Sequence, residues 1–160
     1  MRITLTEPEA FSTLLTQLTG QEPTSPITGI ATDSRECITG DLYIALKGEK
    51  ADGHQFIEQA EKNGAVASLV EYTESVSNEM DYFIVDDVLE TMGSLAHAWR
   101  KQFNIPVIGI TGSNGKTSTK ELLKHIFEDK ENVLATTGNF NTSIGRFYYT
   151  HRTLHTYCIC

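Results

Sequence analysis

The run VIGITGSNGKTSTKELLKHIF, residues 107–127, constrains the fold of this chain more than any other stretch. An apolar segment, a glycine-rich turn and an amphipathic segment follow one another directly, which predicts a strand, a loop and a helix. Gly112 and Gly115 let the backbone turn so that successive N–H groups point inward. A helix that begins near Lys116 directs the positive end of its dipole to the same place, so the run predicts a phosphate-binding loop.

Two side chains of this loop carry the candidate chemistry. Lys116 can reach the β- and γ-phosphates of ATP, and the Thr117 hydroxyl can hold Mg²⁺, so both are candidate catalytic residues and Thr117 is also the candidate metal ligand. Ile110 stands where the strict phosphate-loop pattern has glycine, and the alternative is an ordinary glycine-rich turn with a solvated lysine. The candidate contacts to ATP in the loop are Gly112, Ser113, Asn114, Gly115, Lys116, Thr117 and Ser118.

Composition limits the class of protein. The 160 residues are 39% hydrophobic and 21% charged, which is typical of a soluble globular chain with one domain, or one domain and part of another. A net charge of -8 argues against nucleic acid as a partner, so a phosphate ligand needs a local positive site. The N-terminus lacks a signal-peptide pattern and no apolar run could span a membrane, so we expect a cytoplasmic location. We also expect a monomer.

The periodicity of the chain predicts an α/β fold with a largely parallel sheet. A helix with a Thr6–Glu9 capping box comes first, and a later helix is capped by Asp86 or Asp87. In a second unit, a strand, the helix after the glycine loop and a further strand form a βαβ unit. The expected strands are 27–32, 42–46, 65–70, 82–85, 107–111 and 132–136, a short helix is expected at 54–63, and the expected buried stripe after the loop is Leu122, Leu123, Ile126 and Phe127.

Three segments resemble the Mur ligases, the ATP-dependent amide-forming enzymes of peptidoglycan synthesis, and their folylpolyglutamate synthetase relatives. TGSNGKTSTKE, residues 111–121, is similar to the family's T-G-x-N-G-K-[ST] motif. Its TKE ending and TTGNFNTSIG, residues 136–145, resemble the branch that adds D-alanyl-D-alanine. Residues 32–67 resemble the uridine-nucleotide-binding N-terminal domain, and together the matches extend over about residues 27–145.

This resemblance implies an organisation and a reaction. Residues 1–86 would bind the uridine nucleotide, 87–145 would form a linker helix and the first βαβ unit of a P-loop, parallel-sheet ATP-binding domain, and 146–160 would be an atypical tail. The implied substrates are UDP-MurNAc-tripeptide and D-alanyl-D-alanine. ATP would activate a carboxylate as an acyl phosphate, which the dipeptide amine then attacks. Another Mur ligase or a folylpolyglutamate synthetase relative remains an alternative.

The resemblance also implies substrate contacts. Ser34 and Arg35 offer a hydroxyl and a guanidinium for diphosphate or uracil oxygens, although Arg35 could instead form a surface ion pair with Asp33 or Glu36. Lys47 and Gly53 belong to a tight turn before a helix. His54 follows them and is either a substrate contact or a helix cap.

Residues after the last predicted strand complete the candidate set. They follow the carboxyl end of a strand, where open α/β sheets bind ligands, although a polar loop is the alternative. The resemblance implies that Asn139 contacts the nucleotide and that the contacts to the muramoyl substrate are Thr136, Thr137 and Asn141.

The last fifteen residues, RFYYTHRTLHTYCIC, match neither the family pattern nor a regular periodicity. No acidic residue follows Glu131, so an acidic Mg²⁺ ligand is missing from this region. We expect a truncated or frame-shifted version of a longer ligase that does not turn over alone. The alternatives are a Zn²⁺ site in the tail, a non-catalytic UDP-sugar-binding fragment, and an unrelated P-loop kinase or NTPase.

Overall fold

The computed structural model describes residues 2–48, 51–73, 79–102, 104, 106–129, 133–135 and 157–159. The chain divides into two units, Met1–Leu95 and Ala96–Cys160. The predicted α/β class is confirmed in both units, because each contains a sheet with parallel strands and at least one helix. Among the described residues, no helix combines the length and the apolar character needed to span a bilayer.

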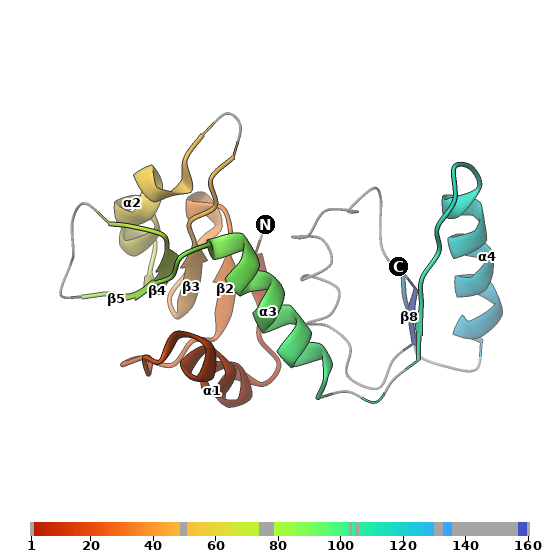
Figure 1. The fold of residues 1–160 in the computed structure, drawn as a ribbon, viewed down its shortest axis with the longest axis horizontal. Helices are drawn as coiled ribbons and strands as arrows, with labels where there is room; N and C mark the ends of the chain where they lie inside the picture. The colour runs from red at the N-terminus through yellow and green to blue at the C-terminus, as the bar shows by residue number, and fades with distance from the viewer. Residues whose placement is uncertain are drawn as a thin grey trace. The chain divides into compact units, whose positions relative to one another are not determined.

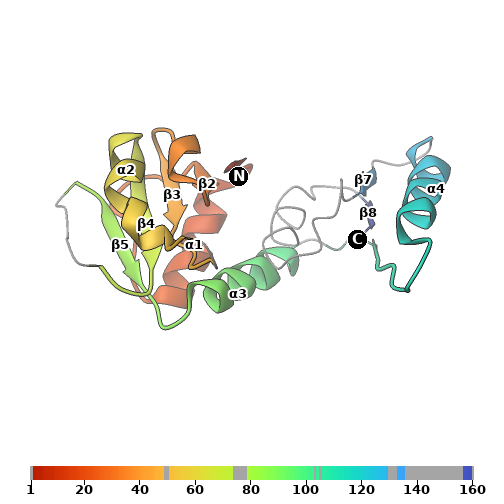
Figure 2. The ribbon, with the colours of Figure 1, turned by 90° about the horizontal axis from the view of Figure 1, so that it is seen from above.

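The first unit is built on a five-stranded sheet with the strand order β1-β2-β3-β4-β5 (Figure 1). The first two strands are antiparallel, and all later neighbours are parallel, with β3, β4 and β5 side by side in Figure 2. The strands are β1 (Arg2–Thr4), β2 (Gly29–Ala31), β3 (Asp41–Ile44), β4 (Ala65–Val70) and β5 (Asp81–Ile84). Its helices are α1 (Pro8–Thr19) and α2 (Ile57–Lys62), with short 3₁₀ turns at Ser34–Glu36 and Gly53–Phe56, and α3 (Val88–Arg100) runs across the boundary between the two units.

Helices cover both faces of this sheet. Successive side chains of a strand point to opposite faces, so Tyr43 and its neighbours Leu42 and Ile44 lie on different sides. Tyr43 packs in a cluster with Ile57 and Ala60 of α2, whereas α1 lies on the other side of the sheet (Figure 1). The inner face of α1 contributes Phe11 and Leu15, which are almost fully buried.

Several helix starts differ from the predicted ones. The predicted Thr6 capping box is wrong, because α1 has Glu7 at its N-cap without a side-chain cap, and Pro8 begins the helix. The predicted helix 54–63 is a 3₁₀ turn followed by α2, because the Asp52 side chain caps the turn at His54. At α3 the prediction holds, since Asp87 Oδ1 accepts from the Glu90 N–H at 2.8 Å.

The second unit contains a three-stranded parallel sheet with the order β6-β8-β7. Its elements are β6 (Val107–Ile108), α4 (Lys116–Glu128), β7 (Val133–Ala135) and β8 (Tyr157–Ile159). The predicted βαβ unit is present, but a third strand lies between its two strands. The sequence of the tail shows no regular periodicity, and β8 nevertheless forms there, where Tyr and Ile have high strand propensity and the flanking strands offer backbone partners on both sides.

The predicted buried stripe of α4 is also wrong. Leu122 and Ile126 are 59% and 55% exposed, and Leu123 and Phe127 are half-buried. The periodicity correctly predicts a helix, but burial depends on the area of sheet available, and strands of two or three residues cover little of it. Among the described α4 residues, the buried side chain is instead that of Lys120, whose ammonium lies 2.8 Å from Glu121 Oε1.

Candidate functional site

A cavity of about 380 Å³ lies at the carboxyl ends of β2 and β3 in the first unit. This is the edge at which open parallel sheets bind ligands, and the volume falls within the range of small-molecule sites, roughly 300–1,000 Å³. The cavity brings together three of the predicted substrate contacts, Ser34, Arg35 and Gly53. The other described lining residues are Thr32, Asp33, Tyr43, Leu46, Ala51, Phe56 and Gln59.

Ser34 is held in this cavity by two polar residues, Gln59 of α2 and Asn63, the C-cap of that helix. The Ser34 hydroxyl donates to Gln59 Oε1 at 2.9 Å, and Asn63 Nδ2 donates to the Ser34 carbonyl at 2.7 Å. Sequence reasoning missed both residues. Their signal was the i, i+4 spacing, which places two amide side chains on one helix face.

Arg35 forms a two-pronged ion pair with Asp33. Its Nε and Nη2 atoms donate to the two carboxylate oxygens at 2.9 and 2.6 Å, and its side chain is 77% exposed. The Arg35 guanidinium, with the Arg35 N–H, lowers the pKa of Asp33 to about 2. The surface ion pair considered for Arg35 is thus present, and Nη1 has no recorded partner among the described residues, so that end is available to an anion.

Gly53 is required by close packing. A Cβ at this position would lie 2.7 Å from the Leu46 backbone N and O atoms, so a larger residue would displace the cavity wall. The Tyr43 hydroxyl donates to the Gly53 carbonyl at 2.9 Å and fixes the same turn. Lys47 pairs with Asp52 across a narrow hairpin. Its side chain is exposed and is not one of the residues that line the cavity.

His54 is buried beside the cavity and is not among its lining residues. Its Nδ1 lies 2.6 Å from Asp52 Oδ1, and its Nε2 accepts from the Glu71 N–H at 2.9 Å, which places the ring proton on Nδ1. The ring also stacks on Tyr72, with centroids 4.3 Å apart. Both ring nitrogens of His54 are engaged by the protein. Substrate contact by His54 stays a prediction, and so does substrate contact by Lys47.

The predicted phosphate-binding loop of the second unit ends at the N-terminus of α4. Gly115 is the N-cap and has a left-handed backbone with φ 78°, which glycine adopts without strain. No side chain of the described residues caps this helix, in contrast to α3, so its first N–H groups are open to a ligand within the part of the chain that the structure describes. Lys116 Nζ folds back and donates to the Gly112 carbonyl, over the loop. The remaining predicted contacts, Ser113, Asn114, Thr117 and Ser118, are exposed in the same loop and first turn.

A preformed metal centre is not found in the described part of the chain. No group of three or more His, Cys, Asp or Glu side chains gathers there. Thr117 contributes one exposed hydroxyl near the loop. The predicted contacts Thr136, Thr137, Asn139 and Asn141 lie outside the described residues, as do the tail histidines.

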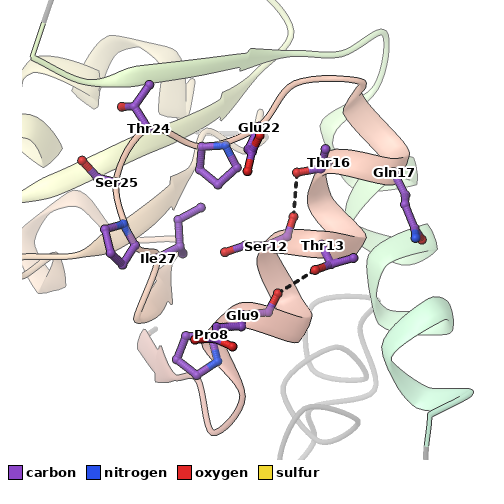
Figure 3. Close-up of a pocket in the computed structure, with 12 residues that line it drawn as sticks. Pro8, Glu9, Ser12, Thr13, Thr16, Gln17, Glu22, Thr24, Ser25 and Ile27 are labelled. Atoms are coloured by element: carbon purple, nitrogen blue, oxygen red, sulfur yellow. Dashed lines mark hydrogen bonds between the residues drawn. The ribbon is translucent and has the colours of Figure 1, made fainter.

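A larger groove of about 620 Å³ runs between α1 and the loop 22–27 (Figure 3). The hydroxyls of its two helix threonines donate inward to the helix backbone, Thr13 to the Glu9 carbonyl and Thr16 to the Ser12 carbonyl, each at 2.9 Å. The groove therefore presents acceptors. Its described lining includes Glu9 and Glu22 and no basic residue, so this groove is unsuited to a nucleotide diphosphate.

Comparison with known families decides the relationship. The family described as "Mur ligase family, catalytic domain" matches residues 26–130, more than half of the chain. This chain belongs to the Mur ligase family. A second family model, described as "Mur ligase middle domain", matches residues 110–159. This match extends beyond Gly145, where the motif resemblance in the sequence ends.

Relatives and solved structures agree with this assignment. The chain is 43% identical over 120 residues to a UDP-N-acetylmuramoyl-tripeptide–D-alanyl-D-alanine ligase of Synechocystis, a match that covers 74% of this chain and 26% of the relative. It superposes on MurF from Acinetobacter baumannii with a TM-score of 0.83 and 34% identity, over 92% of this chain and 34% of that one. MurF from Thermotoga maritima, solved in complex with ADP, gives a TM-score of 0.74 at 34% identity, over 81% of this chain and 31% of that one. The chain thus spans about a quarter to a third of the length of these proteins, and it is MurF-like.

Proposed function

We propose that this Mur ligase chain contributes the uridine-nucleotide site and the phosphate-binding loop of an ATP-dependent ligase that adds D-alanyl-D-alanine to UDP-MurNAc-tripeptide. The names of its relatives support this substrate pair, since the Synechocystis protein is called a ligase of that kind. The proposal includes a cytoplasmic location, where such nucleotide-linked precursors would be joined.

The observation that carries the proposal is the open N-terminus of α4 behind the glycine loop. Among the described residues, no side chain caps its first turn, and no heavy atom lies within 4 Å of the place where a Cβ at Gly115 would project. Such a space suits phosphate oxygens, which accept from several amides at once. Lys116 already lies over the loop, and its ammonium can exchange the Gly112 carbonyl for a phosphate oxygen.

Mg²⁺ fits this loop as a companion of the nucleotide. Thr117 would supply a hydroxyl to the ion, and the phosphates and residues outside the described part would complete its coordination. When bound, Mg²⁺ would neutralise the charge that develops on the phosphates. By the same resemblance, Asn139 would contact the nucleotide, and the substrate contacts would be Thr136, Thr137 and Asn141.

The uridine nucleotide would occupy the cavity beside Ser34 and Arg35. The outer end of the Arg35 guanidinium provides the positive charge that a diphosphate needs, and the geometry of the Asp33 pair holds it in place. Gly53 would keep the backbone close enough to leave the cavity open. Lys47 and His54 lie in the hairpin and turn beside this cavity, and the resemblance implies that they contact the substrate as well.

In the proposed reaction, this chain positions groups and neutralises charge. Phosphoryl transfer depends mainly on those two contributions, because the protein forms no covalent bond to the phosphoryl group. Lys116 would stabilise the negative charge as the terminal phosphoryl group passes to the substrate carboxylate. The cavity residues would hold the uridine end of that substrate.

The test is the binding of Mg²⁺–ATP to the chain and to Lys116→Ala, measured by calorimetry. A charge-assisted contact contributes about 1.5–3 kcal/mol, so the variant should bind at least about tenfold more weakly. Lys124→Ala is the matched control, because Lys124 lies further along α4 and pairs with Glu128 at 3.9 Å. Failure of the unaltered chain to bind Mg²⁺–ATP would refute the ATP half of the proposal, and uptake of UDP-MurNAc-tripeptide alone would favour a non-catalytic binding fragment.

A further inference from the structure

Ser34 and Gln59 form a linked pair of hydrogen-bonding groups on the wall of the 380 Å³ cavity. The two side chains come from different elements, Ser34 from the 3₁₀ turn after β2 and Gln59 from α2. The Ser34 hydroxyl donates to Gln59 Oε1 at 2.9 Å. Because Asn63 holds the Ser34 carbonyl at 2.7 Å, the turn is fixed against the helix.

The direction of this hydrogen bond determines what the pair offers to a ligand. The single hydroxyl proton of Ser34 points to Gln59, so the Ser34 oxygen retains lone pairs and acts as an acceptor. Gln59 uses its carbonyl oxygen for Ser34, so its Nε2 retains two N–H donors. Among the described residues Nε2 has no recorded partner, and the Gln59 side chain is exposed. A donor therefore stands beside an acceptor.

The Tyr43 and Asp33 side chains of the cavity are already engaged within the protein. The Tyr43 hydroxyl donates to the Gly53 carbonyl, and both Asp33 oxygens accept from Arg35. Phe56 also lines the cavity and is 39% exposed, which leaves part of its ring available for stacking on a planar group. The lining thus combines one cation, one aromatic ring and one donor–acceptor pair.

The donor–acceptor pair matches one pyrimidine and not the other. Uracil presents a carbonyl oxygen beside an N3–H, which is an acceptor beside a donor. Cytosine presents an amino group beside an unprotonated N3, which is the reverse. A site whose polar groups complement one base leaves groups unpaired when it meets the other, and this mismatch is the source of strong discrimination.

We propose that Gln59 is a specificity-determining residue that selects uracil over cytosine, with Nε2 donating to a uracil carbonyl oxygen while Ser34 Oγ accepts from N3–H. This inference rests on the proposed function, since it assumes that the uridine nucleotide occupies this cavity. Gln59 is not among the substrate contacts that the resemblance implies. Its N–H donors, beside the Ser34 acceptor, give a chemical reason for the choice of base.

The experiment compares the affinities of UDP and CDP for the unaltered chain and for variants at Gln59, by equilibrium titration. The unaltered chain should prefer UDP by at least about tenfold. Gln59→Leu removes the donors without adding charge, and the preference should fall to within about threefold. Gln59→Glu offers only acceptors, so CDP should gain relative to UDP. Gln55→Glu is the matched control, since Gln55 is exposed outside the recorded lining, and its UDP:CDP ratio should equal that of the unaltered chain.

The outcomes separate this inference from the function beneath it. If UDP binds and both Gln59 variants keep the original UDP:CDP ratio, Gln59 does not read the base, while the uridine site stands. A ratio that also changes in Gln55→Glu would attribute the effect to charge and overturn the inference. If the unaltered chain, shown to be folded by circular dichroism, binds neither nucleotide, the uridine site itself is wrong and the inference is lost with it.

Discussion

At the scale of single residues, the ion pair between Arg2 and Asp41 offers the largest expected effect on stability. Asp41 is fully buried, and its oxygens accept from Arg2 Nε and Nη2 at 2.7 and 2.9 Å. Arg2→Met would leave this carboxylate buried without its counter-charge. We expect the free energy of unfolding to fall by about 3 kcal/mol, measured by urea denaturation.

Two further variants make that prediction specific. The double variant Arg2→Met, Asp41→Asn should recover much of the loss, because the amide is neutral and can still accept from the Ile38 N–H. Arg35→Met breaks the exposed pair with Asp33 and should lower the free energy of unfolding much less than Arg2→Met does, because solvent screens that pair. Equal losses in Arg2→Met and Arg35→Met would show that burial of Asp41 does not control the effect.

A buried hydroxyl provides a prediction of the opposite sign. Ser68 lies in the middle of β4, is fully buried, and its Oγ has no hydrogen-bond partner among the described residues. Ser68→Ala removes this polar group with little change in volume. We expect the free energy of unfolding to rise by about 1 kcal/mol in the same urea assay, and a loss of stability would mean that the hydroxyl has a partner in solution.

At the scale of elements, Asp52 connects the turn Gly53–Phe56 to the end of β4. Its Oδ2 accepts from the Tyr72 hydroxyl at 2.7 Å and its Oδ1 from the His54 N–H at 3.0 Å. The Tyr72 hydrogen bond, followed by the two from His54, lowers the pKa of Asp52 from 3.8 to about 2. A carboxylate with a lowered pKa stabilises the fold above its ordinary pKa, and this contribution disappears as the pH falls through the folded value.

We therefore predict a stability difference between the unaltered chain and Asp52→Asn that is greatest above about pH 5 and shrinks between about pH 4 and pH 2. Thermal unfolding at a series of pH values would measure it. Tyr72→Phe removes the largest cause of the lowered pKa, so its acid-induced loss should begin at a higher pH. A difference that is independent of pH would contradict the assigned carboxylate contacts.

The elements also show what the sequence could predict. The strand 65–70 has its predicted bounds because a continuous apolar run suits a central strand buried on both faces. The start of α4 at Lys116 could also be predicted from the sequence, since a glycine precedes an amphipathic pattern. In contrast, β1 was not predicted, because three residues at a sheet edge give no periodic signal and their partners in β2 are 25 or more positions away.

The candidate sites divide in the same way. The phosphate loop is a linear motif, so every described residue assigned to it lies in the loop or the first turn of α4. The cavity is formed by two separate segments, and Gln59 joins Ser34 only through the packing of α2 beside the turn after β2. The resemblance implied that Ser34 and Arg35 contact the substrate. It could not tell whether His54 is a turn residue or a ligand contact, because its contacts with Asp52 and Tyr72 are visible only in the folded structure.

At the scale of the whole molecule, the two units differ in how deeply the apolar side chains of their helices and strands are buried. In the first unit, β3 and β4 lie in the centre of the sheet, and Leu42 and Leu69 are fully buried. In the second unit, α4 exposes more than half of Leu122 and of Ile126. Since exposed helices open at lower free energy than central strands, backbone amides of α4 should exchange at least about tenfold faster than those of β4.

The same measurement links stability to the proposed ligand. Addition of Mg²⁺–ATP should slow exchange in the first turns of α4, because a ligand that binds the native state stabilises it in proportion to its occupancy. Lys116→Ala should reduce this ATP-dependent protection and leave β4 unchanged, whereas Lys124→Ala should retain it. Protection that spreads equally over β4 and α4, or that persists in Lys116→Ala, would place the nucleotide elsewhere, and then the open helix N-terminus at Gly115 would not be the phosphate site.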